Sequence, residues 1–331
     1  MLAARLGAGA LAAAVVWGGV DQASAEETLR ALSMMPKPVT YTQSFLKFID
    51  KVNAAGQGVV QIEFVGGPEA IPTFDQPEAV RTGVIDMIYG PGSYYPGLVP
   101  ETDALVGSNV TPMAQRQNGG IELLNQIHQE KMNVHYLGHP DGGIQFHIYL
   151  IKQPQLNDDG LPDMSGIKLR GAPIYREFFT DYLGATFVQV NVPEVYTALE
   201  RGTVDGLGWP SIGVMDLSWD NFLKYRIDPG YFQTDLSILV NLDKWNALSD
   251  QAKQILQDTA IEWEQESYEQ LQALRAEEDA EMRKRGMQVV ELPPDAARAY
   301  LQAAYDEAWR RLKERDPTHY DELRARFFKE D

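Results

Sequence analysis

The sequence predicts an α/β protein with two lobes, mostly parallel sheets and one helix long enough to span both lobes. Three observations support this. Short β-like and helical stretches alternate along most of the chain, with Gly or Pro at the junctions. The 331 residues are enough for two domains of ordinary size. A helical pattern begins after Ser249 and ends before Gly286. At 1.5 Å per residue such a helix exceeds roughly 50 Å.

The first 25 residues have the pattern of a secretory signal peptide. An apolar run from Leu6 to Val20 follows Arg5, and the small residues Ala23, Ser24 and Ala25 form a cleavage pattern. This run is shorter than the roughly 20 residues that a membrane span needs. We therefore expect an exported protein whose mature chain begins after residue 25.

Composition restricts the partners and the chemistry. The net charge is −18, and removal of Arg5 and Asp21 with the signal peptide leaves it at −18. So acidic a chain is not expected to bind nucleic acid or anionic membranes, which attract clustered Lys and Arg. A buried cation can still hold a small anion, because distant charges are screened over about 8 Å. Cysteine is absent, which excludes disulfides, a thiolate nucleophile and Cys-ligated zinc.

The first half of the chain alternates strands and helices. Phe45, Phe48, Ile49 and Val52 recur at helical spacing and predict one amphipathic helix. The loops after the first and third expected strands follow carboxyl ends of strands, so both are candidate cleft walls. The expected strands are residues 28–34, 59–65, 84–89, 133–137 and 144–151, and the expected helices are residues 42–55, 77–82 and 112–131.

Residues 166–210 form the clearest β-α-β-α-β pattern. Arg170 ends one of its strands, and Trp209 ends another, so both side chains are expected at one crevice. The preceding segment, residues 152–165, is rich in Pro, Asp and Gly and is expected to be a surface loop. The expected strands of the unit are residues 167–169, 186–190 and 203–207, and its helices are residues 175–182 and 193–201; farther on we expect strands at 236–242 and 287–292 and a helix from Pro294 onward.

The chain lacks the common catalytic signatures, including phosphate loops, metal-binding HExxH helices, nucleophile elbows and dinucleotide-binding glycine motifs. His135 and His139 flank Gly138 at the end of an expected strand, where ordinary polar roles are the better interpretation. Arg170 stands out as a cation beside a buried strand. From spacing alone, a structural salt bridge and a clamp for a ligand carboxylate explain it equally well.

Three motifs carry a family resemblance: Gly166–Arg170 (GIKLR), Leu183–Thr186 (LGAT) and, most specifically, residues 193–206 (PEVYTALERGTVDG). With them the sequence resembles the periplasmic solute-binding proteins of TRAP (tripartite ATP-independent periplasmic) transporters, of the dicarboxylate-binding type. The resemblance implies a two-lobed periplasmic binding protein (type II-like) that closes on a small organic anion. It implies no catalysis, a periplasmic location and delivery to TRAP membrane subunits. Arg170 falls on the arginine that clamps the substrate carboxylate in that family.

The sequence departs from the sialic-acid and C4-dicarboxylate members. Trp209 stands where those proteins usually have Asn, and residues 145–151 contain no second arginine. The combination of Gln145, Arg170 and Trp209 is more similar to the 2-oxo-acid-binding branch, whose members place a metal ion beside the substrate. Asp235 corresponds there to an acidic metal ligand, whereas Gly208 replaces another. We expect no cofactor and leave open a calcium or sodium ion held by Gln145, Trp209 and Asp235.

We therefore expect a receptor for a small monocarboxylate, such as a 2-oxo, 2-hydroxy or aromatic acid. Two alternatives share the same cleft: an exported enzyme such as a lyase, and a ligand-presenting partner of a membrane sensor. The first lobe is expected to comprise residues 26–145 and 236–290, the second residues 146–235, with residues 291–331 packing on both. The candidate ligand contacts are Arg170, Trp209 and Gln145, followed by Tyr89, Ser93, Tyr94, Trp219, Phe232 and Asp235.

Overall fold

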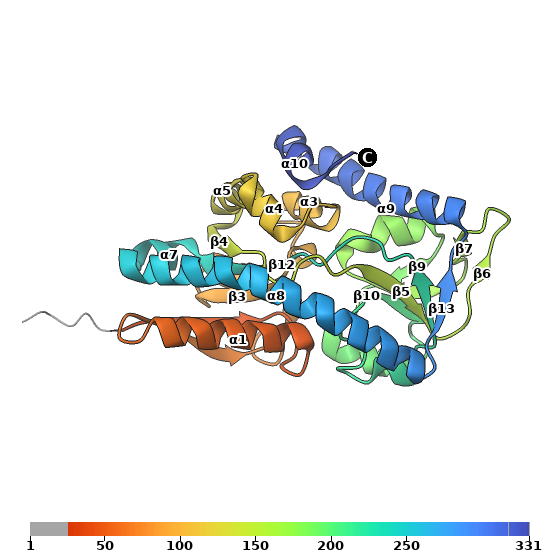
Figure 1. Cartoon of the computed structure of the whole chain (residues 1–331), viewed down its shortest axis with the longest axis horizontal. Helices are drawn as coiled ribbons and strands as arrows, with labels where there is room; N and C mark the ends of the chain where they lie inside the picture. The colour runs from red at the N-terminus through yellow and green to blue at the C-terminus, as the bar shows by residue number, and fades with distance from the viewer. Residues whose placement is uncertain (1–25, 317, 331) are drawn as a thin grey trace, which may run out of the picture.

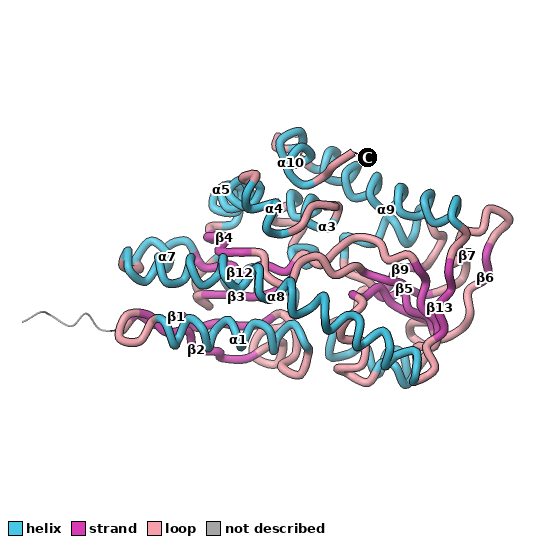
Figure 2. Tube along the Cα trace, in the orientation of Figure 1, coloured by secondary structure: helices cyan, strands magenta, loops and turns pink. Residues whose placement is uncertain are grey.

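The computed structural model describes residues 26–316 and 318–330, so the expected signal peptide at residues 1–25 lies outside the described residues. Two sheets form the centres of two lobes (Figures 1 and 2). The predicted two-lobed α/β fold is confirmed. None of the described helices has an apolar stretch long enough to cross a membrane.

The first sheet has five strands in the order β2-β1-β3-β12-β4. Strand β12 is buried along its whole length, which explains its continuous apolar sequence. Helix α1 covers the sheet through Phe45, Phe48, Ile49 and Val52, as their spacing predicts. The strands are β1 (Glu27–Ser33), β2 (Val60–Gly66), β3 (Met87–Pro91), β4 (Val134–Gly138) and β12 (Leu236–Asn241); the helices around them are α1 (Thr40–Ala55), α2 (Gln76–Arg81), α3 (Asp103–Val106), α4 (Pro112–Gln117), α5 (Gly120–Met132) and α7 (Leu242–Ala247).

The second sheet has six strands in the order β13-β11-β5-β10-β8-β9. It contains the β-α-β-α-β unit, with β10 parallel to β8 and β8 parallel to β9. The strands are β5 (Phe146–Leu150), β8 (Lys168–Arg170), β9 (Thr186–Val188), β10 (Gly206–Pro210), β11 (Tyr225–Asp228) and β13 (Gln288–Glu291); helix α6 (Val195–Glu200) and a π-helical turn (Phe178–Tyr182) lie between them, and β6 (Gln155–Leu156) and β7 (Pro162–Asp163) form a small separate pair.

Both large sheets are mixed. Five of their nine strand pairings are parallel, and the other four are antiparallel. The antiparallel pairings all involve β5 or β12, the strands by which the chain enters a lobe from the other one. The two crossing segments also pair with each other, through Phe146 and Tyr231 and through the Thr234 N–H, which donates to the Ile144 carbonyl at 2.8 Å.

Helix α8 (Asp250–Lys284), 35 residues long, lies across both lobes (Figure 1). The Ser249 hydroxyl caps it by accepting the Ala252 N–H at 3.2 Å. Leu256, Ala260, Trp263 and Leu271 form its buried stripe, as predicted. The chain then enters β13, which pairs in parallel with β11. Residues 288–290 therefore lie in the sheet of the second lobe, a correction to the expected boundary of the first lobe at residue 290.

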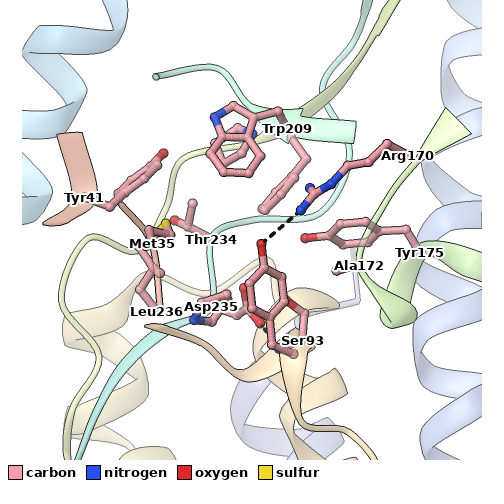
Figure 3. Close-up of a pocket in the computed structure, with 14 residues that line it drawn as sticks. Met35, Tyr41, Ser93, Arg170, Ala172, Tyr175, Trp209, Thr234, Asp235 and Leu236 are labelled. Carbon is pink, nitrogen blue, oxygen red and sulfur yellow. Dashed lines mark hydrogen bonds between the residues drawn. The ribbon is translucent and has the colours of Figure 1, made fainter. Parts of the chain in front are cut away.

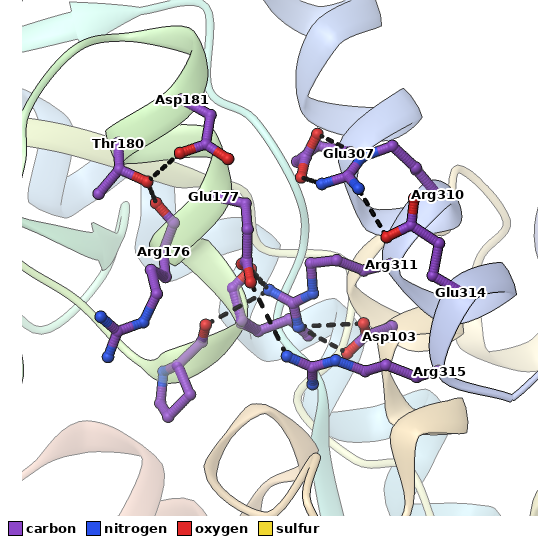
Figure 4. A network of polar contacts seen from close by, with 12 residues as sticks. Asp103, Arg176, Glu177, Thr180, Asp181, Glu307, Arg310, Arg311, Glu314 and Arg315 are labelled. Atoms are coloured by element: carbon purple, nitrogen blue, oxygen red, sulfur yellow. Dashed lines mark hydrogen bonds and ion pairs between the residues drawn. The ribbon is translucent and has the colours of Figure 1, made fainter.

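Helix α9 (Pro294–Arg315) joins the two lobes, and α10 (Tyr320–Phe327) follows it. Arg311 on α9 is buried and donates to both carboxylate oxygens of Asp103 in the first lobe, at 3.1 and 3.0 Å. It also donates to Glu177 at 2.8 Å and to the Ile174 carbonyl in the second lobe. Figure 4 shows Arg311 with Asp103 and Glu177; these residues and Ile174 are called the Arg311 cluster.

Several elements differ from the prediction. The expected helix at 112–131 is broken at Asn118 and Gly119, because Gly119 adopts a left-handed conformation (φ 80°) between α4 and α5. The expected strand at 203–207 lies instead at 206–210, so Trp209 is within β10 and not beyond it. Strand β11 and the short helices α3 and α7 were not predicted, and the expected loop at 152–165 contains the β6–β7 pair.

Candidate functional site

A narrow cavity with about 30 Å³ of free space lies between the lobes. This is far below the roughly 300–1,000 Å³ of small-molecule sites, so the lobes have to separate to admit a ligand. Loops that follow β1 and β3 supply part of one wall, as predicted. Figure 3 shows Met35 and Tyr41 on one side and Arg170 and Tyr175 on the other. The lining residues are Met35, Tyr41, Pro91, Ser93, Tyr94, Phe146, Arg170, Ala172, Tyr175, Trp209, Pro210, Thr234, Asp235 and Leu236.

Arg170 is the cation of this cavity. It is the last residue of β8 and only 1% exposed. Its Nε donates to the Val190 carbonyl at 3.1 Å, and its Nη2 donates to the Tyr94 hydroxyl at 3.4 Å. It forms no ion pair with any residue that the structure describes. Because a buried charge is costly without an opposite charge, the site is suited to an anionic ligand.

Trp209 forms the wall beside this cation. The Arg170 guanidinium carbon lies 5.6 Å from the centre of the indole ring, within the range of a cation–π contact. Trp219 packs against Trp209 edge-to-face, with ring centres 4.9 Å apart. It is buried behind Trp209 and does not line the cavity. Trp209 therefore presents a fixed apolar surface next to the point where an anion would bind.

Asp235 is the second charged side chain of the cavity and is fully buried. It lies on the segment that leads from the second lobe into β12. Its Oδ2 accepts the Ser93 backbone N–H, while its Oδ1 has no hydrogen-bond partner among the described residues. Burial raises the pKa of Asp235 to about 7, and the hydrogen bonds from Ser93 oppose that rise.

Two tyrosine hydroxyl groups near the cavity were not predicted. Tyr41 comes from the first turn of α1, and its buried hydroxyl has no hydrogen-bond partner among the described residues. Tyr175 follows β8 and points its hydroxyl toward the cavity (Figure 3). The position of Tyr41 directly after a predicted cleft-wall loop was the available sequence signal.

Four predicted contacts lie elsewhere. Side chains of β5 alternate between faces, so Phe146 reaches the cavity while Gln145 and His147 face a separate groove that includes Asp228. Tyr89 points toward α1, stacks on Phe45 with ring centres 4.8 Å apart and donates to Asp141. Phe232 packs against Tyr175 and Phe178 in the core. With Trp219, these residues support the site from outside the cavity. Arg170, Trp209, Ser93, Tyr94 and Asp235 are brought together.

The three residues considered for a metal do not meet. Gln145 lines the other groove, which leaves Asp235 as the one carboxylate among the described lining residues. Calcium takes six to eight oxygen ligands. No group of three or more His, Asp or Glu residues in the described ranges is arranged to hold a metal ion. The side chains of this cavity therefore do not form a calcium site by themselves.

Comparisons with known proteins point to one family. The model of bacterial extracellular solute-binding protein family 7 matches residues 33–316. A monocarboxylate 2-oxoacid-binding periplasmic protein of Nostoc sp. is 24% identical over 254 residues, which cover 72% of this chain and 66%, just under two thirds, of that relative.

Solved structures show the same fold. An extracytoplasmic solute receptor of Bordetella pertussis that binds pyroglutamic acid superimposes with a TM-score of 0.79 at 19% identity, covering 91% of this chain and 99% of that one. A TRAP transporter solute-binding protein of Bordetella bronchiseptica, with copurified calcium and picolinate, has a TM-score of 0.79 at 19% identity and covers 92% of this chain and 91% of that one.

Proposed function

The chain belongs to bacterial extracellular solute-binding protein family 7, a family of receptors and not of enzymes, and on that premise we propose that it captures a small monocarboxylate for TRAP uptake. The observation that carries this proposal is Arg170. A buried guanidinium beside an interlobe cavity, with no ion pair to any described residue, is matched in charge and shape by a carboxylate.

The cavity walls favour a compact acid with an apolar body. Trp209, Phe146, Met35 and Leu236 surround the space. These apolar surfaces suit the body of a 2-oxo, 2-hydroxy or aromatic acid once the lobes open. The 2-oxoacid assignment of the Nostoc relative and the picolinate found with the Bordetella bronchiseptica protein support this class. Asp235 disfavours a second carboxylate in the same space, because two like charges repel there.

We place this receptor in the periplasm, where the signal-peptide pattern of residues 1–25 would direct it. The proposed partners are the membrane subunits of a TRAP transporter, contacted by peripheral docking of the loaded receptor. The net charge of −18 is consistent with the absence of nucleic acid from the proposed partners.

A thermal-shift screen of the mature protein tests the proposal. Small carboxylic acids are compared with their amides, which keep the shape and lose the charge. A ligand that binds only the folded state stabilises it, by about 2.7 kcal/mol when its concentration is one hundred times its Kd, and this raises the melting temperature. We expect shifts for a few monocarboxylates and none for their amides. Equal shifts for acids and amides, or none for any acid, would refute the proposal. Repeating the screen with calcium, with sodium and with chelator tests an ion beside the ligand.

A further inference from the structure

Asp235 imposes a second chemical requirement on the ligand. Its carboxylate is fully buried, and Oδ2 accepts the Ser93 N–H. The Ser93 hydroxyl lies close enough to oppose the rise in the pKa of this carboxylate as well. Oδ1 has no partner among the described residues. A buried polar atom that stays without a partner destabilises the protein, and more so when it is charged. Since Asp235 lines the cavity, a ligand group is in a position to supply the missing partner.

The other buried polar atoms at the cavity that lack a hydrogen-bond partner do not require a donor from the ligand. The hydroxyls of Ser93 and Tyr41 also lack partners in the described part of the chain. A hydroxyl rotates and serves as donor or acceptor, whereas an ionised carboxylate only accepts. The Trp209 indole nitrogen points away from the centre of the cavity (Figure 3). Among these groups, Asp235 alone, in its ionised form, requires a hydrogen-bond donor from the ligand.

Arg170 does not satisfy this requirement. Its guanidinium donates to Val190 and Tyr94, and it forms no ion pair with Asp235. The two opposite charges therefore line the same narrow cavity without forming an ion pair with each other. Arg170 belongs to β8 of the second lobe, whereas Asp235 precedes β12 of the first. A ligand that engages both groups holds the two lobes together.

We propose that Asp235 is a specificity-determining residue that selects organic acids carrying an N–H or O–H donor in addition to the carboxylate. This inference rests on the proposed function: Arg170 binds the carboxylate, and Asp235 Oδ1 accepts a hydrogen bond from the donor. The same carboxylate rejects dicarboxylates through like-charge repulsion. A bound cation is the competing explanation, but the described lining side chains offer it only this one carboxylate.

The test compares acids that differ only in the donor. Titration calorimetry at pH 8 measures the mature protein with pyrrole-2-carboxylate against furan-2-carboxylate, and with lactate against pyruvate. Each further acid found in the thermal-shift screen is paired with an analogue that lacks its donor. We expect each donor-bearing acid that binds to do so at least about tenfold more tightly than its partner, because the analogue leaves Asp235 without a hydrogen bond.

The variant Asp235→Asn removes the acceptor charge and adds an amide donor of the same shape. We expect the ratio of the Kd values of the paired acids to approach one in this variant. The control Asp159→Asn changes an exposed carboxylate of the β6–β7 loop and should keep the wild-type preference. Should Asp235→Asn fail to fold, as judged by circular dichroism, the preference of the wild-type protein decides the matter alone.

The possible outcomes separate this inference from the proposed function. If monocarboxylates bind but the paired acids bind equally, Asp235 does not select donors and the inference fails while the proposed function stands. If no acid binds, the proposed function fails. If a donor-free acid binds tightly only with calcium or sodium and loses its affinity in chelator or sodium-free buffer, a cation occupies the place of the donor and the inference is overturned.

Discussion

The substitution Arg311→Met should destabilise the folded protein strongly. Arg311 is 2% exposed and donates to both oxygens of Asp103, which is 1% exposed, and to Glu177. Methionine keeps much of the apolar stem but leaves the Asp103 carboxylate buried without a cation. Removing one partner of a buried ion pair costs about 3–5 kcal/mol. At about 1.6 °C per kcal/mol in a chain of this size, the melting temperature should fall by about 5 °C or more.

The neighbouring residue provides a matched control. Arg310 lies on the same helix, and its side chain is 45% exposed where it pairs with Glu307 and Glu314. Exposed ion pairs contribute about 0–1 kcal/mol, so Arg310→Met should change the melting temperature by no more than about 2 °C. Urea unfolding followed by circular dichroism measures both variants beside the wild type.

The destabilisation by Arg311→Met should also depend on pH. Burial raises the pKa of Asp103 to about 6 in the intact protein, although Arg311 opposes that rise. Loss of Arg311 raises this pKa further, so the folded variant holds a proton at pH values where the wild type does not. Stability falls with rising pH when the folded state binds more protons than the unfolded state. The difference between variant and wild type should therefore be larger at pH 8 than at pH 5.

Two results would refute this reasoning. If Arg311→Met and Arg310→Met shift the unfolding midpoint equally, the buried ion pairs of the Arg311 cluster do not stabilise the fold more than an exposed ion pair does. If the destabilisation is the same at pH 5 and pH 8, the cost does not come from an ionised Asp103.

Two further predictions follow from contacts outside the cavity. Asp216, which follows β10, accepts the Thr40 N–H at 2.6 Å at the start of α1 and so links the lobes. Because such a cap contributes about 1 kcal/mol, Asp216→Ala should weaken ligand binding about fivefold when measured by calorimetry. An unchanged Kd would show that closure of the lobes does not depend on this hydrogen bond. Tyr89→Phe removes a hydrogen bond to buried Asp141; it should lower stability by about 1–3 kcal/mol in urea unfolding and leave ligand affinity unchanged, whereas a large loss of affinity would mean that Tyr89 reaches the ligand.

The elements with strong periodicity could be predicted from the sequence. The spacing of Phe45, Phe48, Ile49 and Val52 indicated α1, and the apolar run after Asp235 indicated β12. The break between α4 and α5 could not be read from apolar spacing, which continues across it. It depends on Gly119 adopting a positive φ, and a glycine also occurs within regular helices.

The site was predictable at strand ends and less so elsewhere. Arg170 follows from the rule that ligands bind at carboxyl ends of parallel strands, and the structure places it at the cavity. Gln145 was misplaced because the face of a strand depends on where the alternation starts, which the sequence of β5 does not define. Tyr89 and Phe232 were candidate contacts, but packing against Phe45 and Tyr175 places them in the core.

The most direct test of the central claim is the affinity of Arg170→Ala for the best monocarboxylate of the screen, measured by titration calorimetry beside the wild type. Each charge-assisted hydrogen bond to the carboxylate contributes about 1.5–3 kcal/mol, so loss of two should weaken binding by at least about a hundredfold. The control Arg176→Ala removes an arginine that packs on Phe187 outside the cavity and should bind normally. A folded Arg170→Ala protein with wild-type affinity would contradict the assignment of Arg170 as the carboxylate-binding residue.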